Sequence, residues 1–176
     1  MFTYVVMAVA AGVGLIWRIK LAHAAAAACA PIGASFTFLA LATGSIWGKP
    51  MWGTWWAWDA RMTSELILLF LYLGYIALVT SIDDMVRGDK AGALLAIVGS
   101  VNVPIIYFSV RWWNTLHQGA TVSLTAAPKM AQTMLLAMLI MTFAFWAYAF
   151  ATVFTRAQAL ALERDSDADW ARKEMK

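Results

Sequence analysis

Residues 45–66 read SIWGKPMWGTWWAWDARMTSEL, and this stretch is the most informative part of the chain. Five of the ten tryptophans lie between Trp47 and Trp58, among glycine, lysine, proline, aspartate and arginine. The segment is too polar for a buried helix and too aromatic for an ordinary loop. It lies between two long apolar stretches, so it predicts a tryptophan-rich connection between two helices.

The composition indicates a membrane protein. Hydrophobic residues make up 62% and charged residues 13% of the 176 residues, whereas about a quarter of a soluble domain is charged. Five apolar stretches run approximately over Phe2–Trp17, Ala24–Trp47, Met62–Ile82, Ala91–Val110 and Ala131–Phe154. All but the first reach the roughly 20 residues that a bilayer core requires. The sequence therefore predicts an all-α polytopic membrane helix bundle with five transmembrane helices.

Lysines and arginines are distributed unevenly between the two ends of the predicted helices. Nine follow the first, third and fifth stretches, and the other end carries four: Lys49, Arg61, Arg111 and Lys129. Because positive charge favours the cytoplasmic side, the loops at 47–61 and 111–130 are predicted to face outward. Residues 1–155 then form a transmembrane domain and residues 156–176 a charged cytoplasmic tail. The sequence contains no cluster of lysines and arginines that would indicate nucleic-acid binding.

The start of the chain is unusual for this topology. The first apolar stretch is short and its beginning is predicted to lie outside, which is an awkward start for insertion. It has no basic region before it and no cleavage site, so it does not resemble a signal peptide. We therefore expect that the chain lacks one upstream helix.

Several residues within the spans have structural explanations. Pro104 should kink the fourth span, with Asn102 close by to satisfy freed backbone groups. Glu65 is expected in the first turn of the third span, where the helix dipole favours an acid, although acids at membrane depth often have a function. The single cysteine, Cys29, cannot form an internal disulfide or a C-x-x-C-H attachment site.

The two outer loops together carry seven tryptophans and one of the two histidines. His117 lies in VRWWNTLHQGAT, whereas His23 follows Arg18 and Lys20 and is expected on the cytoplasmic side. An aromatic belt at the membrane surface would explain some of these tryptophans. Four others lie beyond the predicted span and indicate a binding surface, namely Trp52, Trp55, Trp56 and Trp58.

A flat apolar ligand with anionic edges would suit this set of residues. Aromatic rings would cover its faces, and Lys49, Arg61 or Arg111 would pair with its carboxylates. His117 would ligate a metal at its centre. Haem has all three features.

The sequence resembles a known family at these residues. WGKPMWGTWWAWDARMTSELILLFLYLGYIAL, residues 47–78, resembles the WWD segment of the haem-handling membrane proteins of cytochrome c biogenesis. WWNTLHQG, residues 112–119, narrows the resemblance to the haem exporter protein C (CcmC) family, and the similarity extends over essentially the whole chain. It implies six helices in the bacterial inner membrane. It also implies non-covalent haem b at the periplasmic surface, held by two axial histidines from the flanking outer loops.

The resemblance implies roles for individual residues. His117 matches one axial iron ligand, and the haem-binding residues expected here are His117, Trp52, Trp55, Trp56, Trp58, Arg61, Trp112 and Trp113. Gly53 and Asp59 are expected to structure the loop or bind a partner. For Asp59 we expect a bond to a backbone N–H or to Arg61. The family's other histidine precedes the first apolar stretch, in a loop that this chain lacks together with the family's first helix.

The resemblance also implies partners and a function. Such proteins present haem at the periplasmic face and pass it to a haem chaperone (CcmE), and an ATP-binding-cassette complex (CcmA and CcmB) releases the loaded chaperone. This chain has no P-loop, so we expect no ATPase activity, and at most a lyase-like assistance to the chaperone. One alternative is a cofactor-free membrane scaffold that docks a periplasmic protein through its tryptophans. Another is a haem permease, for which the spans offer little charge.

Overall fold

The computed structural model describes residues 1–113, 115–117 and 130–165. Within them the chain forms six helices and no strand: α1 (Phe2–Trp17), α2 (Lys20–Trp52), α3 (Ala60–Ser81), α4 (Met85–Gly99), α5 (Asn102–Trp112) and α6 (Gln132–Arg164). Four segments of this part are long and apolar enough to cross a membrane, namely α2, α3, α6 and the joined α4–α5 segment, whereas α1 is shorter. The predicted all-α polytopic membrane bundle is therefore confirmed.

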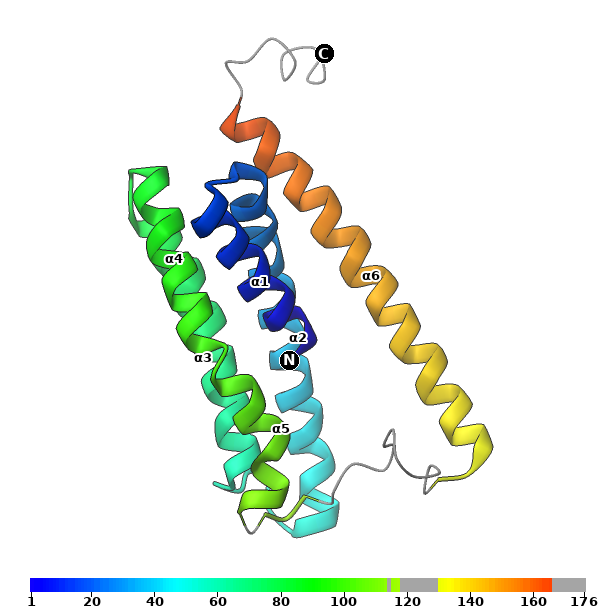
Figure 1. Cartoon of the computed structure of the whole chain (residues 1–176). Coiled ribbons are helices and arrows are strands. Elements are labelled where there is room, and N and C mark those ends of the chain that lie inside the picture. Colours follow the sequence, from blue (N-terminus) through cyan, green and yellow to red (C-terminus); the bar gives the residue numbers. More distant parts are fainter. Residues whose placement is uncertain (114, 118–129, 166–176) are drawn as a thin grey trace.

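Helix α2 lies at the centre of the bundle, with α1, α3 and α6 packed against it (Figure 1). Its buried face consists mainly of alanines together with Cys29 and Gly33. Such small residues let helix backbones approach closely in a membrane. At Gly33 the approach is so close that a Cβ atom would overlap the ring of Tyr72 in α3. Tyr72 in turn packs edge to face against Tyr4 of α1, with ring centroids 5.0 Å apart.

The fourth predicted span is divided into two helices, which confirms the effect predicted for Pro104. Helix α4 ends at Gly99 and α5 begins at Asn102. Proline at position 104 cannot donate a hydrogen bond to the carbonyl of Ser100, and its ring would clash with that carbonyl in a continuous helix. Asn102 satisfies a carbonyl of a neighbouring helix rather than one freed by the proline. Its Nδ2 donates to the carbonyl oxygen of Ser64 in α3 at 2.9 Å.

Helix α2 is longer than predicted, so the first part of the segment 47–61 is helical rather than loop. Pro50 lies inside the last turns of α2, where its missing N–H removes only one helical hydrogen bond. The helix ends at Gly53, which has a φ of 76° and caps α2 in the left-handed region. The N–H of Gly53 donates to the carbonyl of Lys49 at 3.0 Å. The connection to α3 is therefore limited to residues 53–59.

Glu65 does not lie in the first turn of α3, because that helix begins at Ala60. The prediction that the helix dipole explains Glu65 is therefore wrong. The residue instead lines a cavity of about 690 Å³ between α1, α2, α3 and α6, together with Cys29 and Tyr72. No residue of the tryptophan-rich connection lines this cavity.

Helix α6 has no buried residue and packs mainly against α2. Figure 1 shows it leaning away from the other helices toward its first residues, drawn in yellow. At its other end, Arg164 donates to both carboxylate oxygens of Asp89 in α4, at 2.8 and 2.9 Å. Lys20 pairs with Asp165 at 2.9 Å. The helix thus continues beyond the predicted boundary at residue 155, and residues 166–176 of the predicted tail lie outside the described part.

Candidate functional site

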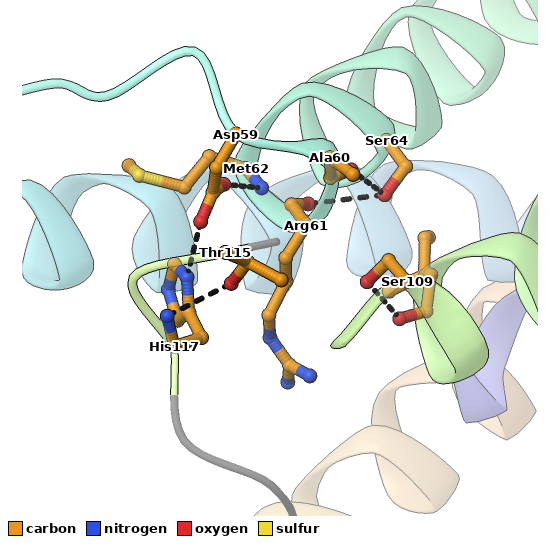
Figure 2. A network of polar contacts seen from close by, with 9 residues as sticks. Asp59, Ala60, Arg61, Met62, Ser64, Ser109, Thr115 and His117 are labelled. Carbon is orange, nitrogen blue, oxygen red and sulfur yellow. Dashed lines mark hydrogen bonds and ion pairs between the residues drawn. The ribbon is translucent and has the colours of Figure 1, made fainter. Parts of the chain in front are cut away.

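The two predicted outer loops lie at the same end of the bundle. Helices α2 and α5 end there and α3 begins there (Figure 1). In the α2–α3 connection, the hydroxyl of Thr54 donates to the carbonyl of Trp56 at 2.9 Å and also accepts from the N–H of Trp56 at 3.4 Å. This turn shortens the connection and carries its tryptophans past the end of α2. A contact between Asp59 and His117 joins the connection to the second loop (Figure 2).

Asp59 is the N-cap of α3 and uses both of its carboxylate oxygens. Oδ1 accepts a hydrogen bond from the N–H of Met62 at 2.8 Å, and Oδ2 lies 2.7 Å from Nδ1 of His117. Burial by itself would raise the pKa of Asp59. Hydrogen bonds from the Met62 backbone, His117 and Thr115 outweigh burial and lower this pKa below its ordinary value. Asp59 is therefore ionised at neutral pH, with His117 rather than Arg61 as its side-chain partner.

His117 is held on three sides. Its backbone N–H donates to the hydroxyl of Thr115 at 2.8 Å, and its ring stands edge-on to Trp52 with centroids 4.8 Å apart. Because Nδ1 faces an ionised carboxylate, that nitrogen carries the proton and donates it. The Nε2 atom, on the opposite edge of the ring, has no hydrogen-bond partner among the described residues. Within the described part of the chain, no donor competes with a ligand for its lone pair.

Tryptophan rings surround this histidine in a chain of edge contacts. Trp47 stands edge-on to Trp52 at 5.2 Å, and Trp52 contacts His117 as described above. Trp56 and Trp58 form a second pair, with centroids 5.5 Å apart. Trp56 is partly buried, and its Nε1 atom has no hydrogen-bond partner within the described part of the chain. An indole N–H that is buried in this way is normally paired.

Five tryptophan side chains at this end are more than half exposed, namely Trp47, Trp55, Trp58, Trp112 and Trp113. The ring of Phe108 stacks on Trp112 with centroids 5.1 Å apart, which fixes the last turn of α5. Exposed aromatic rings that are already ordered by their neighbours are suited to bind a flat partner. All seven tryptophans predicted for the outer face lie in this region of the bundle.

The predicted cations differ in their surroundings. Lys49 donates to the carbonyl of Gly53 at 3.2 Å and lies 5.8 Å from the centroid of the Trp55 ring. Arg61 extends from the first turn of α3 beside the His117 loop (Figure 2), and it forms no ion pair with any described residue. Arg111 is exposed in the last turn of α5. Lys129 lies outside the described residues.

Two properties of the site limit what it can bind. A shallow cavity of about 330 Å³ lies beside His117 and is lined by Trp58, Asp59, Thr115 and their neighbours. The larger cavity, near Glu65, lies between α6 and the helices α1, α2 and α3, away from this site. Among the described residues there is no group of three histidine, cysteine, aspartate or glutamate side chains that could hold a metal ion. A lone imidazole suits an ion that already has ligands of its own, as iron has in haem.

The second histidine of the chain is remote from the site. His23 lies near the start of α2 and is buried against Gly14 of α1, whereas Trp52 is the last residue of α2. At a rise of about 1.5 Å per residue, His23 and Trp52 are about 40 Å apart along the helix. His23 therefore cannot approach a ligand that His117 binds.

Known proteins are similar to this chain over most of its length. The family model described as Heme exporter protein C matches residues 1–172. The Heme exporter protein C of Haemophilus influenzae is 50% identical over 98% of this chain and 70% of its own length. That of Escherichia coli K12 is 64% identical over 67% of this chain and 48% of its own length. That of Bradyrhizobium diazoefficiens is 54% identical over 82% of this chain and 55% of its own length.

The chain thus spans about half the length of two of these relatives and 70% of the third. The match covers the tryptophan-rich connection, the His117 loop and all six helices. This protein belongs to the Heme exporter protein C family.

Proposed function

We propose that this protein holds haem at the end of the bundle that carries His117, and delivers it to the haem chaperone CcmE for cytochrome c maturation. The contact between Asp59 and His117 carries this proposal. It joins two loops, far apart in the sequence, into one surface. On that surface an imidazole nitrogen stays open beside exposed aromatic rings.

The residues at this surface fit haem in each of its chemical features. Exposed tryptophan rings match the flat apolar macrocycle, and the open Nε2 of His117 matches the iron. Arg61 and Arg111 match the propionates, because guanidinium groups bind carboxylates with two parallel hydrogen bonds. Haem b bound without a covalent bond is the form that suits this set, since the only cysteine is buried in α2.

The role of the chain is to orient its cargo. Haem supplies the iron and the reactive edge, and the chain supplies the imidazole, the aromatic faces and the cations. A ligand held at helix ends keeps one edge open, so a partner protein can approach it. Energy for the release of the loaded chaperone would come from the ATP-binding-cassette proteins CcmA and CcmB. We propose no ATPase activity for this chain and at most assistance to the chaperone's own chemistry.

Charge supports the orientation of this surface toward the periplasm of the bacterial inner membrane. In the sequence, four of the thirteen lysines and arginines belong to the segments 47–61 and 111–130, and the other nine follow the first, third and fifth apolar stretches. The positive-inside bias places the richer end in the cytoplasm. The C-terminus then lies in the cytoplasm and His117 outside. Labelling of Leu116→Cys and Asp84→Cys with a membrane-impermeant thiol reagent would test this orientation. We expect the reagent to label position 116 from the periplasm and not position 84.

The absorption spectrum of the protein, purified from haem-replete membranes, tests the proposed function. We expect a Soret band that is lost or shifted in His117→Ala and unchanged in His23→Gln, the control at the other end of α2. Imidazole added to His117→Gly should restore the band, because it replaces the missing ligand. A band that is unaffected by His117→Ala would exclude His117 as the iron ligand.

A cofactor-free docking scaffold is the second candidate, and the exposure of Trp55, Trp58, Trp112 and Trp113 favours it. Tryptophan is a frequent anchor of protein interfaces. The two functions differ in haem stoichiometry. Haem on the purified protein alone supports the carrier. Haem that is found only in a complex with the chaperone, together with chaperone binding that survives His117→Ala, supports the scaffold.

A further inference from the structure

The two carboxylate oxygens of Asp59 have separate partners. Oδ1 accepts from the backbone N–H of Met62 and so caps α3, at 2.8 Å. Oδ2 lies 2.7 Å from Nδ1 of His117. The Asp59 side chain is 8% exposed and that of His117 is 23% exposed, so water competes little for this contact. The carboxylate that begins α3 is therefore also the group that orients the histidine.

We propose that Asp59 is a positioning residue for haem iron. It fixes the His117 ring so that Nε2 is the nitrogen presented to the iron, and it makes that nitrogen a stronger electron donor. This inference rests on the proposed function, since it concerns how His117 meets haem.

The choice of nitrogen follows from the tautomer. An ionised carboxylate accepts a proton-bearing Nδ1, which leaves the lone pair on Nε2. Metal-ligating histidines generally donate their other N–H to a carboxylate or a carbonyl, and this partner fixes the ring and raises the basicity of the ligand. The negative charge of Asp59 is transmitted through the ring and favours ferric over ferrous iron. The same contact therefore sets both the geometry and the redox preference of bound haem.

Two of the groups that support this contact lie at helix ends. Asp59 is fixed as the N-cap of α3, and Trp52, at the last position of α2, packs against the His117 ring at 4.8 Å. The hydroxyl of Thr115 holds the backbone of His117. Sites supported by helices hold ligands more accurately than sites supported by loops alone. Figure 2 shows the Asp59 carboxylate between the start of α3 and the His117 ring.

The substitution Asp59→Asn separates the capping of α3 from the orientation of His117. The asparagine carbonyl can still cap α3, because asparagine is as good an N-cap as aspartate. Its single carbonyl oxygen cannot also accept from His117, and its NH₂ group facing Nδ1 would favour the tautomer with the proton on Nε2. That tautomer has no lone pair for iron. Asp84→Asn is the matched control, since Asp84 caps α4 through Val86 and Arg87.

The experiment is a titration of the purified protein with hemin, followed at the Soret band, and a redox titration at saturating hemin. For Asp59→Asn we expect affinity about 10- to 100-fold weaker and a more positive midpoint potential, while Asp84→Asn matches the unsubstituted protein. In a His117→Ala background, Asp59→Asn should change hemin affinity no further, because its effect passes through the histidine.

Three results would overturn the inference, and they differ in what they leave standing. Affinity and potential unchanged in Asp59→Asn, with a normal loss in His117→Ala, would overturn the positioning role and keep the proposed function. If Asp59→Asn lowers hemin affinity by the same factor in the unsubstituted protein and in the His117→Ala background, the effect of Asp59 does not pass through His117. Asp59 would then have a role in folding only. No hemin binding by the unsubstituted protein would remove the proposed function and the inference together.

Discussion

The ion pair between Arg164 of α6 and Asp89 of α4 provides a quantitative test of how the bundle is held together. The Nη1 and Nη2 atoms of Arg164 donate to separate carboxylate oxygens of Asp89, at 2.8 and 2.9 Å. The side chains are 10% and 11% exposed, respectively. Helix α6 has no buried residue of its own, so apolar packing contributes less to its attachment than it does for α1 or α3. We therefore expect this pair to fix the end of α6.

The magnitude follows from burial. Removing one partner of a buried ion pair leaves an unpaired charge and costs about 3–5 kcal/mol. Because the pair lies at a helix end, where water can approach the charge that remains, we expect the lower value, about 3 kcal/mol, for Asp89→Asn or Arg164→Gln. The double substitution should cost less than the two single ones together, with a coupling free energy of about 2 kcal/mol.

The neighbouring pair of Lys20 and Asp165 is a matched control. It also joins the end of α6 to the rest of the bundle, at 2.9 Å, but its side chains are 76% and 31% exposed. Exposed pairs contribute about 0–1 kcal/mol. Lys20→Gln and Asp165→Asn should therefore change stability little, alone or together.

The assay is equilibrium unfolding by SDS in mixed micelles, with the free energy of unfolding compared at a fixed SDS fraction for each double-mutant cycle. A coupling free energy for Asp89 and Arg164 that is no larger than that for Lys20 and Asp165 would refute the reasoning. In that case burial at this helix end would not strengthen the pair, and α6 would be held by its contacts with α2.

Further predictions concern single positions. Gly33→Ala should destabilise the protein by about 1–3 kcal/mol, because the added Cβ overlaps the Tyr72 ring; Gly44→Ala, where a Cβ meets no atom within 4 Å, should not, and equal effects in SDS unfolding would contradict this. Gly53→Ala should cost about 1–2 kcal/mol, because φ is 76° there, and Gly53→Asn should recover part of the loss in the same assay. Asn102→Leu should cost about 1 kcal/mol through the lost bond to α3; an unchanged free energy of unfolding would assign that bond no role.

The helices could be predicted because their signals are local. A long apolar run identifies a membrane span regardless of how the helices pack. Pro104 likewise interrupts its helix, between α4 and α5, regardless of the packing around it. The end of α2 was harder to predict, since Pro50 indicates a loop. The left-handed glycine at position 53, which ends the helix, is only one of several glycines nearby. Aspartate at position 59 followed by a helical pattern is an N-cap signal that would have moved Glu65 out of the first turn.

The contacts that build the site could not be predicted in the same way. Asp59 and His117 are 58 positions apart, and their meeting depends on how α2, α3 and α5 pack. The sequence indicates that both residues lie on one face, but a charge count cannot distinguish His117 from Arg61 as the partner of Asp59. The pair of Asp89 and Arg164, 75 positions apart, likewise depends on where the last turn of α6 lies relative to α4. Charged residues near the ends of predicted spans are the sequence signal from which such long-range pairs could be sought.

The placement of the site at helix ends has a consequence for a carrier. Trp52 ends α2, Asp59 is the N-cap of α3 and Trp112 ends α5, so helix ends support a site whose histidine and remaining tryptophans lie in the adjoining loops, outside the bundle. A cofactor that stays bound is normally enclosed by apolar walls, whereas here five tryptophans are more than half exposed. Such a surface can orient a ligand without burying all of it. If haem is the ligand, affinity must come from iron ligation more than from burial. The geometry of the Asp59–His117 contact then governs how readily haem is passed on.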